Sequence, residues 1–133
     1  MSGYAVKRID EMEGIYLGSF KFARAELGVT SFGMAVMDIP AGYADYPEHD
    51  HSEDGQEEVY LALRGSGEIE IEGERHSLDP DTMVRVSAGT KRKILPGDDG
   101  IRVLALGATP GRPYEVQEST ELGTPDPMAQ SSD

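Results

Sequence analysis

Short apolar stretches separated by turn signals run through most of the chain. The clearest pattern is the strict alternation at 68–72, which directs Ile69 and Ile71 toward a core and the intervening glutamates toward water. The Gly73 turn that follows predicts a β-hairpin tip. Further short strands are predicted at 32–39, 58–63, 75–78, 83–86 and 101–106, with turns at 65–67, 79–81 and 96–100. This succession predicts an all-β sandwich or barrel.

The two ends of the chain have a different pattern. A short strand is predicted at 4–9, and a brief helix at 19–27 that stops at Gly28. Residues 118–133 are rich in Ser, Thr, Pro, Gly and acidic side chains, which bury little surface. We therefore divide the chain into an N-terminal extension packing on the barrel (1–32), a barrel (33–117) and a flexible acidic tail (118–133).

Composition narrows the function classes. A chain of 133 residues fits one domain, and 25 acidic against 12 basic side chains give a net charge of −13, which disfavours nucleic acid as a partner. The absence of Cys excludes disulfides, thiol nucleophiles and Cys-ligated metals. No apolar run approaches the roughly 20 residues that span a bilayer, and the first residues lack a signal-peptide core, so we expect a soluble, cytoplasmic protein without a membrane partner.

Two of the three histidines, His49 and His51, are separated by one residue. On an extended strand such residues point to the same side. A loop at 52–56 then lets the chain reverse and brings Glu57 or Glu58 opposite the imidazoles. Two imidazoles and one carboxylate suit a divalent metal and leave coordination positions open. A His-x-His pair is also common on solvated surfaces, so the carboxylate and the strand-rich frame strengthen the metal hypothesis.

The spacing of these residues resembles the first motif of the cupin superfamily. Gly42, the His49–His51 pair, Glu58 and Gly65 follow in the family's order, with six residues between Glu58 and Gly65. The gap between His51 and Glu58 is longer than in the family motif, which suggests a longer loop at the barrel mouth. The frame of the second cupin motif is also kept, with Pro80, Ser87 and Arg92 at the positions where cupins have Gly, Pro and His. The resemblance covers about residues 33–107.

The resemblance implies an all-β cupin fold, a double-stranded β-helix or jelly-roll barrel, with a short N-terminal extension. It also implies a divalent metal (Fe, Mn, Ni or Zn) held by His49, His51 and Glu58. Arg92 occupies the position of the usual fourth ligand, and a guanidinium has no lone pair to donate. Arg92 is left with three roles: to pair with Glu58, to clamp an anionic ligand, or to turn outward.

Strand parity and motif spacing disagree about which glutamate, Glu57 or Glu58, supplies the carboxylate of the site. Glu57 shares a face with apolar Val59 and Leu61, whereas the spacing to Gly65 favours Glu58, which we follow. Tyr60 then lies beside Glu58 on the pocket face, where it packs in the core or contacts a ligand.

Two functions remain open from the sequence. One is a metal-dependent enzyme acting on a small polar or anionic molecule. The other is a metal-free binding or sensing module for a small organic anion or sugar, with Arg92 in place of the fourth ligand. Because small cupins commonly pair through sheet edges, the resemblance also implies a homodimer.

Overall fold

Two long strands organise the molecule. The computed structural model describes residues 3–43 and 46–128. In it β4 (Glu57–Ile71) and β7 (Arg92–Ala108) pair antiparallel along most of their length. The shorter strands are β1 (Gly14–Ile15), β2 (Phe20–Lys21), β3 (Gly33–Ile39), β5 (Glu74–Leu78) and β6 (Met83–Val86). The helical elements are α1 (Ala23–Leu27) and two 3₁₀ turns, Ile9–Glu11 and Glu118–Thr120. The predicted all-β architecture is confirmed.

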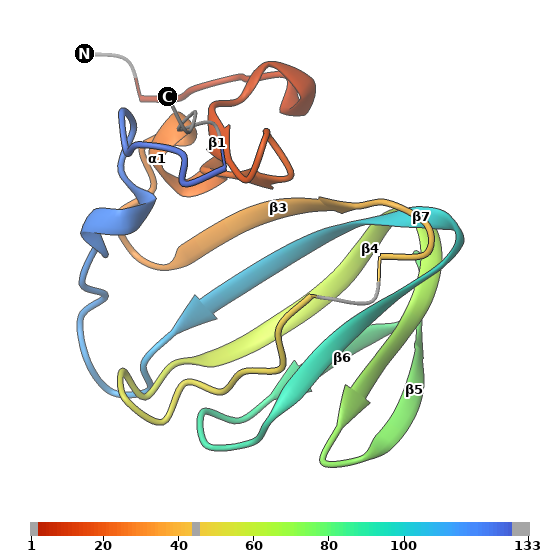
Figure 1. The fold of residues 1–133 in the computed structure, drawn as a ribbon. Helices are drawn as coiled ribbons and strands as arrows, with labels where there is room; N and C mark the ends of the chain where they lie inside the picture. Colours follow the sequence, from red (N-terminus) through yellow and green to blue (C-terminus); the bar gives the residue numbers. More distant parts are fainter. Residues whose placement is uncertain (1–2, 44–45, 129–133) are drawn as a thin grey trace.

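The strands roll into a barrel because β4 and β7 each contribute to two layers. The sheet order is β1-β2-β3-β7-β4-β5, and β6 pairs with the first half of β4. In Figure 1, β3 forms the top of the barrel, and β5 and β6 form its lower right-hand part. The enclosed core is aliphatic and aromatic; its fully buried members include Tyr60, Ile69, Leu78, Ile94 and Val103.

Glycines let both long strands turn the corner between layers without losing their pairing. The sequence predicted chain-breaking turns at 65–67 and 96–100, and this prediction is wrong, since β4 and β7 run through them. A Cβ on Gly67 would lie 2.2 Å from the Leu95 carbonyl oxygen, and one on Gly65 would lie 2.3 Å from that of Gly100. Only glycine allows backbones this close, and the register shifts there mark a bulged bend rather than a turn.

The N-terminal extension covers the outer face of β3. Met12 and Ala23 pack on Val36, forming a second apolar cluster. The strand predicted at 4–9 is wrong, because the only regular element before Gly14 in the described part of the chain is the 3₁₀ turn Ile9–Glu11. The predicted helix starts only at Ala23, since Phe20–Lys21 pairs with β3, but it ends as predicted at Gly28, whose φ is 77°.

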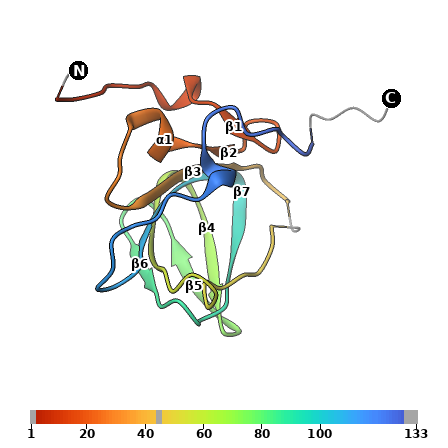
Figure 2. The same ribbon diagram turned by 90° about the vertical axis from the view of Figure 1, so that its left-hand side faces the viewer.

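The segment after β7 returns to this extension. It rises along the left-hand side of Figure 1 to the region of α1, and Figure 2 shows the same path from a side view. The Asp126 carboxylate accepts hydrogen bonds from the amides of Tyr16 and Leu17, each 2.8 Å long. The sequence predicted a flexible tail over residues 118–133. Within 118–128, however, the chain makes specific contacts such as those of Asp126. Residues 129–133 of the predicted tail lie outside the described residues.

No helix within residues 3–43 and 46–128 has the length and apolar character needed to cross a membrane.

Candidate functional site

Glu58 lies near the start of β4, where the strand forms one wall of the barrel interior. It faces Gly107 of β7 on one side and Val86 of β6 on the other. A Cβ on Gly107 would lie 2.8 Å from Gln56 Oε1 and 3.2 Å from Glu58 Cγ. The glycine therefore leaves the space that the Glu58 side chain occupies.

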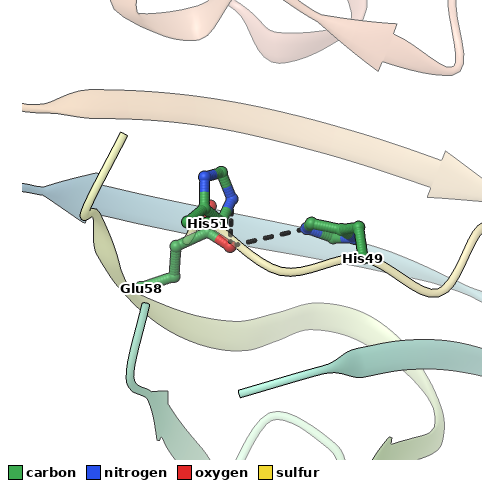
Figure 3. Close-up of side chains that lie close together, drawn as sticks. All are labelled: His49, His51 and Glu58. Atoms are coloured by element: carbon green, nitrogen blue, oxygen red, sulfur yellow. Dashed lines mark ion pairs between the residues drawn. The ribbon is translucent and has the colours of Figure 1, made fainter. Parts of the chain in front are cut away.

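Backbone pairing holds the two histidines opposite this carboxylate. His49 and Arg92 exchange two backbone hydrogen bonds of 2.9 Å, and the His51 amide donates to the Ala88 carbonyl at 2.7 Å. The segment is thus extended, and both imidazoles turn toward Glu58, as Figure 3 shows. Their ring centres are 5.3 Å apart. The sequence predicted this shared orientation from the one-residue spacing.

The three side chains present a convergent set of donor atoms. Glu58 Oε1 lies 3.0 Å from His51 Nε2 and 3.7 Å from His49 Nε2, and one ligand atom from each residue falls within 4.8 Å of the others. A divalent ion with bonds of about 2.1 Å at right angles holds neighbouring donors about 3 Å apart. The donor types and the Glu58–His51 separation therefore fit a two-His-one-carboxylate metal site, for which His49 Nε2 must move closer to Glu58 by less than about 1 Å.

Neighbouring groups fix the orientation of these donors. The carboxylate of Asp54 lies 3.1 Å from His51 Nδ1, which leaves Nε2 directed at Glu58. The Tyr60 hydroxyl donates a hydrogen bond to Glu58 Oε1. Burial and the adjacent Glu58 charge raise the pKa of Tyr60 well above its usual value, so its hydroxyl stays protonated.

The electrostatics of the cluster favour a charged carboxylate. Burial acts to raise the pKa of Glu58, but hydrogen bonds from His49, His51 and Tyr60 outweigh it and hold that pKa far below its usual value. The hydrogen bond to Glu58 is also the main reason why the pKa of His51 is raised. Glu58 is therefore ionised and ready to bind a cation.

Arg92 lies fully buried at the start of β7, with a side chain that is 0% exposed. One guanidinium nitrogen donates to Glu58 Oε1 at 3.3 Å and another to the Ser87 carbonyl at 2.9 Å. The outward role is therefore excluded, and the structure shows the pairing with Glu58. Arg92 is also not among the described residues that line the adjacent cavity, whereas Tyr60 is.

A cavity of about 160 Å³ adjoins the three donors. Its walls are mostly apolar and include Phe20, Phe22, Met34, Met37, Tyr46, Tyr60 and Tyr114. The polar lining, besides His49, His51 and Glu58, comprises Arg24, Gln56, Gln117 and Thr120. Sequence reasoning missed the contributions of the N-terminal extension and of the segment after β7, which no local pattern connects to the histidine motif.

The competing candidates lie elsewhere. Glu57 points away from the cluster, and its exposed carboxylate lies 3.8 Å from Arg85. The spacing to Gly65 was therefore the better guide, because the apolar face shared with Val59 and Leu61 is the outer face of the sheet. The third histidine, His76, is exposed on β5.

Comparison with known proteins identifies the fold. No family model matches the chain, and no curated protein was found similar to it in sequence. A crystal structure of a cupin protein from Bacteroides fragilis is similar, with a TM-score of 0.67, 24% identity, and coverage of 88% of this chain and 93% of that one. The fold is therefore an all-β cupin barrel, and the resemblance seen in the motifs is confirmed at the level of fold.

Two further structures share the barrel alone. The cupin domain of an XRE family transcriptional regulator from Enterobacter cloacae has a TM-score of 0.52, 21% identity, and coverage of 62% of this chain and 86% of that one. A predicted oxalate decarboxylase from Thermotoga maritima has a TM-score of 0.51, 20% identity, and coverage of 59% and 68%. Since these neighbours include both a predicted decarboxylase and a domain of a transcriptional regulator, the fold does not select an activity.

Proposed function

We propose that His49, His51 and Glu58 bind one divalent metal ion, and that the protein is a metal-dependent enzyme for a small polar or anionic molecule held in the cavity. The observation that supports this most directly is the convergence of three metal-binding side chains on the wall of a cavity. When bound, such an ion supplies Lewis-acid polarisation of a ligand oxygen or, if it is iron, oxygen chemistry.

The chain's own residues prepare this site in distinct ways. Glu58 supplies the negative charge, and Tyr60 and Arg92 hold its carboxylate in place through hydrogen bonds. Asp54 orients His51. The mostly apolar walls lower the local dielectric, which strengthens electrostatic contacts with a ligand inside the cavity.

Metal titration tests this proposal. Protein purified without a His-tag and then chelated should take up one equivalent of Fe(II), Mn(II), Ni(II) or Zn(II), measured by calorimetry and elemental analysis. His51→Ala should lower the affinity more than about 100-fold, because a direct ligand matters at least as much as the groups that orient one. His76→Ala, which removes an exposed imidazole, should have no effect. Absence of uptake by the wild-type protein would reject the metal site.

One observation favours a second candidate, a metal-free binding or sensing module. Arg92 already places a positive charge beside Glu58, and a cation nearby weakens the affinity for a metal ion. In this case organic acids or sugars should raise the melting temperature equally with and without a chelator. Stabilisation that disappears on chelation would instead support the enzyme.

The homodimer stays a prediction, and the outer face of the sheet supports it. Met83 of the edge strand β6 is 69% exposed and pairs with Leu61, and Leu63 on β4 is also exposed. An apolar edge of this kind is suited to contact with a second copy. Sedimentation velocity at micromolar concentration should show a dimer, and a monomer alone would contradict it.

A further inference from the structure

Another buried arginine, Arg24, does line this cavity, unlike Arg92. Arg24 lies on α1, and its side chain is only 7% exposed. One terminal nitrogen donates to the Val29 carbonyl at 2.8 Å, and the other donates to Glu121 Oε1 at 3.0 Å. Its Nε is buried without a hydrogen-bond partner among the described residues. This guanidinium is therefore an incompletely satisfied cation in the wall of a mostly apolar cavity.

We propose that Arg24 binds the carboxylate of a small ligand with an apolar body, and that Glu121 occupies this position until the ligand replaces it. The inference deepens the proposed function. It rests on that function for one point: the other end of the ligand would direct an oxygen atom toward the metal ion held by His49, His51 and Glu58. It narrows the ligand class from small polar molecules in general to carboxylic acids with an aromatic or branched aliphatic body.

The lining of the cavity supports this ligand class. Phe22 and Tyr114 line the same cavity as Arg24, and the thioethers of Met34 and Met37 add further apolar surface. Such walls favour a hydrocarbon body over a sugar, whose hydroxyls would be left without partners there. A carboxylate has two oxygens and can accept hydrogen bonds from two guanidinium nitrogens at once. Nε and Nη2 of Arg24 form one edge of the guanidinium, so a carboxylate that replaces Glu121 at Nη2 can also accept from the buried, unpartnered Nε.

Glu121 is suited to being replaced. Its side chain is 53% exposed, so its carboxylate is readily hydrated when it leaves Arg24. A ligand carboxylate keeps the charge on Arg24 balanced during the exchange. The separate attachment of Asp126 to the amides of Tyr16 and Leu17 holds the end of this segment in place. Only the part of the segment around Glu121 then needs to move.

The experiment uses the full-length, chelated protein with 3-phenylpropanoate and the matching neutral amide as probes. Calorimetry should show the carboxylate binding about tenfold or more tightly than the amide, the difference expected for a charge-assisted hydrogen bond. Glu121→Gln should tighten binding of the carboxylate several-fold, because it removes the competing charge, and should leave the amide unchanged. Glu118→Gln makes the same charge change on the same segment and serves as the control.

The outcomes separate this inference from the metal site. Equal binding of the two probes, or equal behaviour of Glu121→Gln and Glu118→Gln, overturns it. Arg24→Lys should weaken binding of the carboxylate probe. If that variant fails to fold, the comparison of Glu121→Gln with Glu118→Gln still tests the inference. Retained preference for the carboxylate in the His49→Ala/His51→Ala protein supports the Arg24 site even where the metal titration fails. Metal uptake by a protein that shows no such preference overturns this inference alone.

Discussion

Two arginines of β7 illustrate how differently a buried guanidinium can be used. Arg102, on the outer face of the sheet, donates to both oxygens of Asp38 at 2.7 and 3.0 Å and also pairs with Asp10. Arg92, inside the barrel, reaches one oxygen of one carboxylate, and its Nε has no partner among the described residues. Both side chains are almost completely buried.

The two clusters differ in what surrounds them: one joins elements of the fold, and the other borders the cavity. The carboxylates of Asp10 and Asp38 balance the charges of Arg102 and Lys21 and join the N-terminal extension and β3 to β7. Around Arg92, by contrast, Glu58 Oε1 is shared between the guanidinium, Tyr60 and two imidazoles, and the cluster borders a cavity. Crowding several donors on one oxygen is a poor way to stabilise a fold and a good way to keep a charged ligand atom in position.

The largest effect should come from Glu58→Gln. Removing this charge leaves Arg92 buried without a counter-ion, and such a loss costs about 3–5 kcal/mol of unfolding free energy. Urea denaturation monitored by circular dichroism measures it. The neighbouring exposed residue provides the control, since Glu57→Gln should change stability by no more than about 0.5 kcal/mol. Equal costs at the two positions would show that Arg92 does not depend on Glu58.

Asp38→Asn should have a smaller effect on the outer cluster. Asp10 still pairs with Arg102 in this variant, and the Asp38 side chain is 32% exposed, so water replaces part of the lost contact. We expect a loss of about 1–2 kcal/mol in the same urea experiment. A cost as large as that of Glu58→Gln would contradict the view that the outer cluster has redundant partners.

Tyr60→Phe should cost still less, about 1 kcal/mol, because it removes one hydrogen bond and leaves the packing of the ring unchanged. The same variant should weaken metal binding about tenfold, since Glu58 loses a group that orients it. Tyr43→Phe alters an exposed ring and should change neither quantity. A stability loss without any change in metal affinity would assign Tyr60 to the core alone.

The smallest effect is the pH dependence of the outer cluster. Burial acts to raise the pKa of Asp38, but hydrogen bonds from Arg102 outweigh it and lower the pKa below the ordinary 3.8. The stabilisation from Asp38 is therefore complete above pH 3.8 and is lost as the pH falls through the lowered value. The stability difference between wild type and Asp38→Asn should be constant from pH 5 to 7 and shrink below pH 3.8. A stability difference that grows below pH 3.8 would contradict a lowered pKa for Asp38.

Local patterns predicted the parts of the fold that depend on neighbours in sequence. The alternation around Ile69 and Ile71, the hairpin tip at Gly73 and the strand Met83–Val86 all depend on side chains a few residues apart. The bends at Gly65 and Gly97 were mistaken for turns, because glycine permits both and only pairing with the other strand distinguishes them.

In the candidate site, too, only the features set by neighbours in sequence were predicted. The orientation of His49 and His51 and the choice of Glu58 follow from spacing along the chain. The partners of Arg24 do not, because Glu121 lies 97 positions away and is brought close only by the path of the chain after β7. The sequence left three roles open for Arg92, because spacing along the chain does not show which charged side chain a buried guanidinium contacts.

The attachment of the last described segment to the N-terminal extension has an evolutionary consequence. The groups that would hold a metal come from the middle of the chain, whereas Arg24, Tyr114 and Gln117 come from its two ends. Substitutions or short insertions at either end of the chain can therefore reshape one side of the cavity while the histidine motif on the other side is preserved. Related proteins built on this scaffold can therefore differ in the shape of the cavity while keeping His49, His51 and Glu58.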